Sequence, residues 1–141
     1  MAENLRMQLL TCLLSQDHQF KPFELAPRER LVQELVSWGL NNSNNPKNLD
    51  EICTELFTSR RTLILGSKDN FKCGPMELLR TIRLQQVHAL LRSPQARQDA
   101  GLHQVHDVAA HFGFRSRGHF AKAYQDHFDE APRTTLNRSA A

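Results

Sequence analysis

The chain repeats part of its own sequence at an offset of 57 positions. Four pairs of residues in equivalent roles carry the repeat: Ser59 and Ser116, Leu63 and Phe120, Phe71 and Phe128, and Pro75 and Pro132. Each copy consists of a short helical segment, a tight turn, a segment headed by serine, and a proline that opens the next segment. Serine is a preferred helix-capping residue, and proline is tolerated at the first helical position. This order is typical of a helix-turn-helix unit, so the sequence predicts two of them.

Helical periodicity dominates the 141 residues, whereas valine, isoleucine and threonine form no alternating runs. We therefore expect an all-α fold in which two helix-turn-helix subdomains are joined by a long linking helix. The expected boundaries are residues 1–27 for an N-terminal helix and linker, 28–74 for the first subdomain, 75–93 for the linking helix and 94–141 for the second subdomain.

Capping residues and helix breakers place the helices of the first subdomain. An amphipathic helix is expected over residues 28–40, and Asn48 is expected to cap a short helix that stops near Phe57. Ser59 then caps a third helix, whose buried positions should be 63, 67 and 71. The residues between the second and third helices leave room for only a tight turn.

The linking helix and the second subdomain follow from similar signals. Gly74 and Pro75 open the linking helix, which is expected to extend over about 17 residues and roughly 25 Å. The polar stretch 95–101 is expected to be a loop. A short helix that ends at Gly113 and a helix capped by Ser116 complete the second subdomain.

Charge is distributed unevenly along the chain. Residues 1–57 contain five lysines and arginines against eight acidic residues, whereas residues 58–141 contain thirteen against seven. A basic region of this kind favours a polyanionic partner, most often nucleic acid. A solvated helix face would produce the same excess, so the charge alone does not decide between the two interpretations.

The exposed sides of the two serine-capped helices are the candidate DNA-reading surfaces. In a helix-turn-helix unit the second helix enters the major groove, and its first turn meets base edges and phosphates. Arginine can bond a guanine edge, glutamine can bond an adenine edge, and lysine suits a phosphate. The candidate residues are Ser59, Arg60, Arg61, Ile64, Leu65 and Lys68 in the first copy, and Ser116, Arg117, Gly118, Ala121, Lys122 and Gln125 in the second. Two equivalent basic faces on one repeat are harder to explain by solubility than a single one.

The sequence lacks the residue patterns that several other classes of function require. Cys12, Cys53 and Cys73 lie far apart without a CxxC pair, which indicates neither a disulfide framework nor a thiolate zinc site and fits a reducing cytosol. The histidines within 103–111 lack the helical spacing and the intervening carboxylate of a metalloprotease site. The apolar cluster 7–14 is too short to cross a bilayer. We therefore expect a cytoplasmic, nucleoid-associated protein that has no membrane segment, catalytic residue, metal or cofactor and is not an enzyme.

Two alternatives stay open from the residues alone. A helical adaptor could bind a protein through the exposed leucines near the N-terminus, and its affinity should barely respond to salt, whereas DNA binding should weaken steeply as salt rises. The helix-turn-helix domain of a recombinase is the second alternative, and its full chain should carry clustered catalytic acids or a nucleophile elsewhere.

The sequence resembles the C-terminal DNA-binding domain of the AraC/XylS family of bacterial regulators. The most specific stretch is 113–128, Gly-Phe-Arg-Ser-Arg-Gly-His-Phe-Ala-Lys-Ala-Tyr-Gln-Asp-His-Phe, which is followed by Ala131 and Pro132. Two further markers are the pair of segments 82–84 and 90–91 in the linking helix, and the stretch 49–63. Coincident matches at the correct spacing are more specific than an isolated motif, and together they cover roughly residues 28–136.

This resemblance implies a transcription regulator whose two recognition helices read successive major-groove segments on one face of double-stranded DNA. The family's groove-facing positions fall on the candidate residues given above, and Arg83, Arg133 and Thr134 match places where members touch phosphates or brace the helices. Family members usually carry an N-terminal effector-binding or dimerisation domain, and residues 1–20 resemble its last helix. RNA polymerase is a further expected partner. The stretch 118–124, together with Glu130, Thr135 and Leu136, faintly resembles the ethanolamine-utilisation regulators.

The sequence departs from the family pattern at four positions. Ser67 stands where a large aromatic residue usually anchors the recognition helix, and the loss of such a side chain could cost a few kcal/mol. Lys72 and Asp129 stand where glycine is common, so a left-handed backbone there would be mildly strained. Ile64 replaces a commonly polar base-reading residue and is expected to contact a thymine methyl group.

Overall fold

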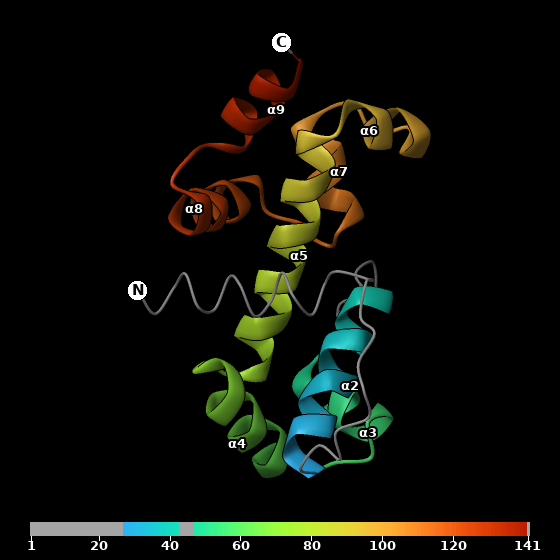
Figure 1. The fold of residues 1–141 in the computed structure, drawn as a ribbon, viewed down its shortest axis with the longest axis vertical. Helices are drawn as coiled ribbons and strands as arrows, with labels where there is room; N and C mark the ends of the chain where they lie inside the picture. Colours follow the sequence, from blue (N-terminus) through green and yellow to red (C-terminus); the bar gives the residue numbers. More distant parts are fainter. Residues whose placement is uncertain (1–26, 43–46, 141) are drawn as a thin grey trace, which may run out of the picture. The chain divides into compact units, whose positions relative to one another are not determined.

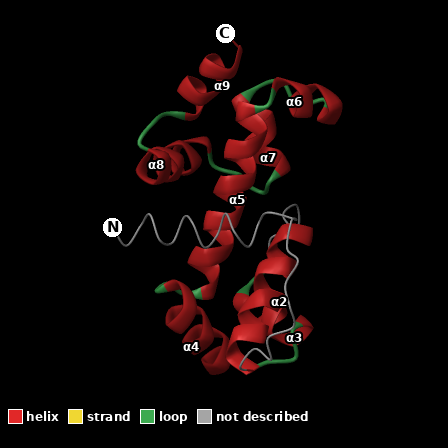
Figure 2. Cartoon of the chain, viewed as in Figure 1, coloured by secondary structure: helices red, strands yellow, loops and turns green. Residues whose placement is uncertain are grey.

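The computed structural model describes residues 27–42 and 47–140, and the regular elements within these ranges are all helices (Figure 2). The elements are α2 (Pro27–Asn41), α3 (Leu49–Glu55), α4 (Arg60–Phe71), α5 (Pro75–Arg92), α6 (Pro94–Ala100), α7 (Val105–His111), α8 (Arg117–Phe128) and α9 (Pro132–Ala140) (Figure 1). The all-α expectation is therefore confirmed. The N-terminal helix expected within residues 1–27 falls almost entirely outside the described residues.

The described residues form two compact units, and the boundary between them falls inside α5, between Ile82 and Arg83. Of the described residues, the first unit contains 27–41 and 47–82, and the second contains Asn42 and 83–140. Each unit has a hydrophobic core of its own. The 18-residue helix α5 therefore contributes its beginning to one core and its end to the other.

Close packing between helices defines the core of the first unit. Ile52 and Leu63 are fully buried there, and position 67 is fully buried as well. Gly39 permits a close approach, because a Cβ atom at this position would lie 2.7 Å from Cδ2 of Leu79. Ser67, which replaces the expected aromatic anchor, donates a hydrogen bond of 2.9 Å to the carbonyl oxygen of Cys73. The small side chain thus has its own polar partner inside a closely packed unit.

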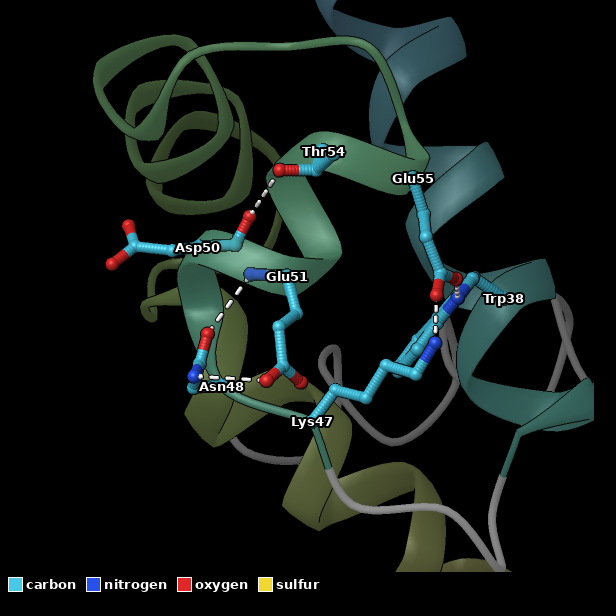
Figure 3. A network of polar contacts seen from close by, with 7 residues as sticks. All are labelled: Trp38, Lys47, Asn48, Asp50, Glu51, Thr54 and Glu55. Carbon is cyan, nitrogen blue, oxygen red and sulfur yellow. Dashed lines mark hydrogen bonds and ion pairs between the residues drawn. The ribbon is translucent and has the colours of Figure 1, made fainter.

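A polar network fixes α3 beside the end of α2 (Figure 3). Asn48 caps α3 by accepting a 2.9 Å hydrogen bond from the Glu51 amide, and its own amide group donates to the Glu51 carboxylate at 3.2 Å. Glu55, at the end of α3, accepts hydrogen bonds from the Trp38 indole and from Lys47. Because Trp38 belongs to α2, these contacts hold α3 in place to brace the next helix, α4.

Aromatic packing and a buried polar chain organise the second unit. The ring of Tyr124 lies 4.6 Å from that of Phe128, and its hydroxyl donates a 2.8 Å hydrogen bond to Thr135. Thr135 in turn donates a 2.6 Å bond to Glu130, and this bond lowers the pKa of the Glu130 carboxyl. Nδ1 of His88 lies 2.8 Å from the Tyr124 hydroxyl, and burial lowers the pKa of this histidine. The chain of contacts ties α5, α8 and α9 together.

The expectation of a loop over residues 95–101 is wrong, because Pro94–Ala100 forms helix α6. Ser93 caps this helix by accepting a 3.2 Å hydrogen bond from the Ala96 amide, and Gly101 ends it in a left-handed conformation with φ of 69°. Arg97 points inward and is only 7% exposed. Its guanidinium donates hydrogen bonds to carbonyl oxygens at the end of α5 and to Ser139 of α9. A polar side chain therefore anchors α6, which explains why apolar periodicity did not predict it.

The two recognition-helix candidates end in the same way. Lys72 follows α4 with φ of 60°, and Asp129 follows α8 with φ of 57°. Their amides donate to the carbonyl oxygens of Lys68 and Gln125 at 3.0 Å and 2.9 Å, which closes the last turn of each helix. The expected left-handed conformation at both positions is confirmed, and both residues lack the glycine that adopts it without steric cost.

Candidate nucleic-acid interface

Helix α4 presents a basic face to solvent. Its cap is Ser59, whose Oγ accepts a 3.1 Å hydrogen bond from the Thr62 amide. The opposite face is buried and carries Leu63, Gly66, Ser67 and Phe71. Among the candidate residues, Ser59, Arg60, Arg61 and Lys68 are exposed, whereas Ile64 and Leu65 are half-buried. The basic candidates are therefore open to a ligand, and the two apolar ones are only partly accessible.

Arg60 forms an ion pair of 3.4 Å with Asp50 of α3. The two side chains are 62% and 70% exposed. Exposed pairs of this kind contribute about 0 to 1 kcal/mol, because water screens them. Arg60 can therefore exchange Asp50 for a phosphate or a base edge at little energetic cost.

Helix α8 presents the equivalent face in the second unit. Its cap is Ser116, whose Oγ accepts a 3.3 Å hydrogen bond from the His119 amide. The predicted contact residues on its free side are all exposed: Ser116, Arg117, Gly118, Ala121, Lys122 and Gln125. A Cβ atom at Gly118 would meet nothing within 4 Å, so this part of the helix surface is open. Lys122 forms an exposed pair with Asp126 at 3.6 Å, which a phosphate could replace.

A groove of about 890 Å³ runs along the start of α8, beside α7 and the start of α9. Three arginines line it, namely Arg115, Arg117 and Arg133, and its apolar lining includes Phe114 and Leu136. Among the residues described, no carboxylate lines this groove. Its charge therefore suits an anion. Arg115 was not among the residues predicted from the sequence. The only signal for it is the length of its turn, which is one residue longer than the turn of the first unit.

The remaining predicted phosphate contacts differ in accessibility. Arg133 and Thr134 are exposed in the first turn of α9. Arg83, in contrast, is half-buried in α5, and burial lowers the pKa of its guanidinium. A half-buried arginine at this position suits the bracing role better than the role of a free phosphate ligand.

Within residues 27–42 and 47–140, no group of three histidine, cysteine or carboxylate side chains is placed to hold a metal ion. His106 instead pairs with Asp107, its Nε2 lying 3.1 Å from the Asp107 carboxylate, and both side chains are slightly less than half exposed. Of the helices in the described part of the chain, none combines the length and the apolar character needed to cross a membrane.

Two helical units, each with a short helix, a tight turn and a capped helix with a free basic face, define a helix-turn-helix DNA-binding fold. The chain belongs to the helix-turn-helix domain family, because the model described as "Helix-turn-helix domain" matches residues 52–138, more than half of its length.

Similar proteins point to one group of regulators within this fold. The chain is 30% identical over 120 residues to the HTH-type transcriptional regulator GbdR of Pseudomonas aeruginosa, and the match covers 84% of this chain and 31% of GbdR. It is 30% identical over 131 residues to the HTH-type transcriptional activator RhaS of Escherichia coli O157:H7, which covers 93% of this chain and 44% of RhaS. The chain thus spans less than half the length of these curated relatives.

Solved structures agree with the sequence matches. A transcriptional regulator with an AraC-type DNA-binding domain from Chromobacterium violaceum superposes with a TM-score of 0.70 at 25% identity, covering 79% of this chain and 94% of that one. A probable AraC family regulator from Rhodopseudomonas palustris gives a TM-score of 0.65 at 26% identity, with 78% and 97% covered. The resemblance to AraC-type DNA-binding domains is therefore confirmed, and the relatives that share this domain are transcription regulators of bacteria. The resemblance to the ethanolamine-utilisation regulators stays a prediction.

Proposed function

We propose that this chain is the DNA-reading part of a transcription regulator and that α4 and α8 read two successive major-groove segments of one operator. The observation that carries the proposal is the equivalence of the two helices. Both have 12 residues, both are capped by serine, and both bury one face while exposing a basic one. Such a helix is the element that enters the major groove in helix-turn-helix proteins.

Distinct roles follow from the chemistry of the exposed side chains. We assign base reading to Arg61, Arg117 and Gln125, because arginine and glutamine can make two hydrogen bonds to one base edge. Lys68 and Lys122 suit phosphates, as compact charges without a planar fork. The other candidates take supporting roles: Ser59 and Ser116 cap the helices, Gly118 and Ala121 allow close approach, Ile64 and Leu65 offer apolar contact, and Arg60, Arg83, Arg133 and Thr134 hold or brace the backbone contacts.

The proposed activity is recognition without bond making or breaking, so it needs no catalytic residue and no cofactor. Because the relatives are more than twice as long as the match, we propose that the complete regulator also has an effector-binding or dimerisation domain. RNA polymerase is the partner proposed for activation or repression, and the cytoplasm is the proposed location. The division into two subdomains and a linking helix over 75–93 is part of the same proposal.

Selection of bound duplexes from a random DNA pool tests the proposal. Affinity for the selected duplex should fall steeply as salt rises, because lysine and arginine displace counterions from the phosphates. Failure to enrich any duplex from the pool would favour the adaptor alternative, in which the partner is a protein.

Two substitutions in α8 then separate base reading from electrostatic attraction to the phosphates. Arg117→Ala should cost about 1 to 3 kcal/mol on the selected site and relax the preference at one base pair, whereas Lys122→Ala should weaken all sequences alike and reduce the salt slope by about 1. Arg92→Ala is a matched control, because it removes an exposed arginine of the same unit that lies outside the groove and off α8. Equal weakening on every sequence by Arg117→Ala would refute the base-reading role.

A further inference from the structure

Phe57 is a large apolar side chain held in solvent. It is 97% exposed, and Met76, at 42%, is the other exposed large apolar residue among those described. The backbone of Phe57 is also unusual, because its φ is 53° in the turn between α3 and α4. Phenylalanine rarely adopts this left-handed conformation, in which its Cβ crowds the backbone.

In the equivalent turn of the second unit, a glycine occupies the position that has positive φ. Leu56 and Phe112 end α3 and α7 with similar angles, φ of −88° and ψ of 2° against φ of −94° and ψ of 17°. The next residue has positive φ in both turns: Phe57 in the first unit and Gly113, with φ of 87°, in the second. The turn geometry therefore requires no side chain at this position.

The fold gains little from the phenylalanine ring. The turn is closed by two backbone hydrogen bonds, from Phe57 to the Thr54 carbonyl at 3.3 Å and from Thr58 to the Cys53 carbonyl at 3.0 Å. Glycine or asparagine would make the same bonds with less strain. In the second turn the aromatic residue is Phe114, which is partly buried against the core with its ring 5.0 Å from that of Phe120. Phe57 makes no such contribution, so folding stability does not explain it.

We propose that the ring of Phe57 contacts an apolar part of the DNA, either a deoxyribose or a thymine methyl group, at the edge of the segment read by α4. This inference rests on the proposed function. The position supports it, because Phe57 stands two residues before the cap of α4 and is followed closely by the exposed Arg60 and Arg61. The first turn of a recognition helix is the part that meets bases and phosphates. The arginines there supply charge, and the ring supplies apolar contact, as phenylalanine does with thymine.

The test measures thermal stability and DNA affinity, which substitutions of Phe57 should change in opposite directions. Phe57→Gly and Phe57→Asn should raise the thermal midpoint of the chain, because both residues tolerate positive φ. The same variants should lower affinity for the selected duplex by about fivefold to thirtyfold, because an apolar contact is lost. The slope of affinity against salt should stay unchanged, since no charge is removed. Met76→Gln is the matched control, which removes the other exposed apolar side chain and should leave affinity unchanged.

A selected duplex in which thymines are replaced by deoxyuridine identifies the DNA group. If Phe57→Gly binds the deoxyuridine duplex as tightly as the wild-type chain does, the contact is a methyl group, and if Phe57→Gly is weaker on this duplex by the same factor as on the thymine duplex, the contact is a deoxyribose. Unchanged affinity of Phe57→Gly would overturn the inference, and so would a fall in thermal midpoint together with affinity, which would indicate a structural role. Both results leave the proposed function standing as long as the wild-type chain binds the selected duplex in a salt-dependent manner.

Discussion

Replacement of Arg97 by methionine should destabilise the second unit by about 2 kcal/mol. The guanidinium is buried and donates to the carbonyl oxygens of Leu90 and Leu91 at the end of α5 and to Ser139. A hydrogen bond that involves a charged group contributes about 1.5 to 3 kcal/mol, and a cation at a helix C-terminus adds about 0.3 to 1 kcal/mol.

Two features of the site reduce this total. The Leu91 carbonyl also accepts a 2.8 Å bond from Ser139, and the Leu90 carbonyl accepts a 3.2 Å bond from the Ser93 amide, so neither loses every partner. Methionine also avoids the cost of burying a charge without a carboxylate. The net loss is therefore nearer to one charged hydrogen bond than to three.

Urea unfolding followed by far-ultraviolet circular dichroism measures this loss. For a unit of this size, about 2 kcal/mol corresponds to a thermal midpoint lower by about 8 to 16 °C. Gln98→Met is the control, because it places methionine on the exposed side of the same helix and should change the free energy of unfolding by less than about 0.5 kcal/mol. An Arg97→Met chain as stable as this control would refute the anchoring role of Arg97.

Three further predictions concern stability. Lys72→Gly and Asp129→Gly should each raise the free energy of unfolding by about 0.5 to 1 kcal/mol in urea titrations, because both positions have positive φ. A lower free energy of unfolding in either variant would show that the native residue there is not strained. Ser67→Phe should lower it by at least about 1 to 3 kcal/mol in the same assay, because the fully buried position is already packed; a more stable variant would show that the aromatic anchor is simply missing. Because burial lowers the pKa of His88 below its usual 6.5, the unfolded chain binds this proton more tightly, so stability should fall as pH is lowered through 6.5. His88→Gln should flatten this part of a pH series of urea unfolding curves, and an unaltered slope would exclude His88 as its source.

Local signals in the sequence were sufficient for most of the helices. The serines at 59 and 116 accept hydrogen bonds from the first turns of α4 and α8, and Pro75 begins α5, as their intrinsic preferences predict. The repeat also predicted which side of each recognition helix is buried, because Leu63 and Phe120 sit at equivalent positions in the two cores. These features depend on near neighbours in the chain, and a single sequence contains that information.

Features that depend on distant partners were not predicted. Helix α6 is anchored by Arg97, whose partner Ser139 lies 42 positions further along the chain, so its polar sequence was interpreted as a loop. Arg115 is identified as a candidate residue only by the structure, in which it lines the groove beside α7, α8 and α9 together with Arg133. The positive φ of Phe57 gave no signal, because no glycine marks the turn. Of the candidate site, residue types and exposure of the basic side chains were predictable, whereas the groove and the turn were not.

The central claim is that α4 and α8 each read their own major-groove segment, and interference footprinting on the selected duplex tests it most directly. Methylation of guanine N7 should block binding in two clusters whose centres lie about one helical turn, or roughly 10 base pairs, apart. Arg61→Ala should remove interference from one cluster only, and Arg117→Ala from the other only. A single cluster, or the loss of the same cluster in both variants, would contradict the account.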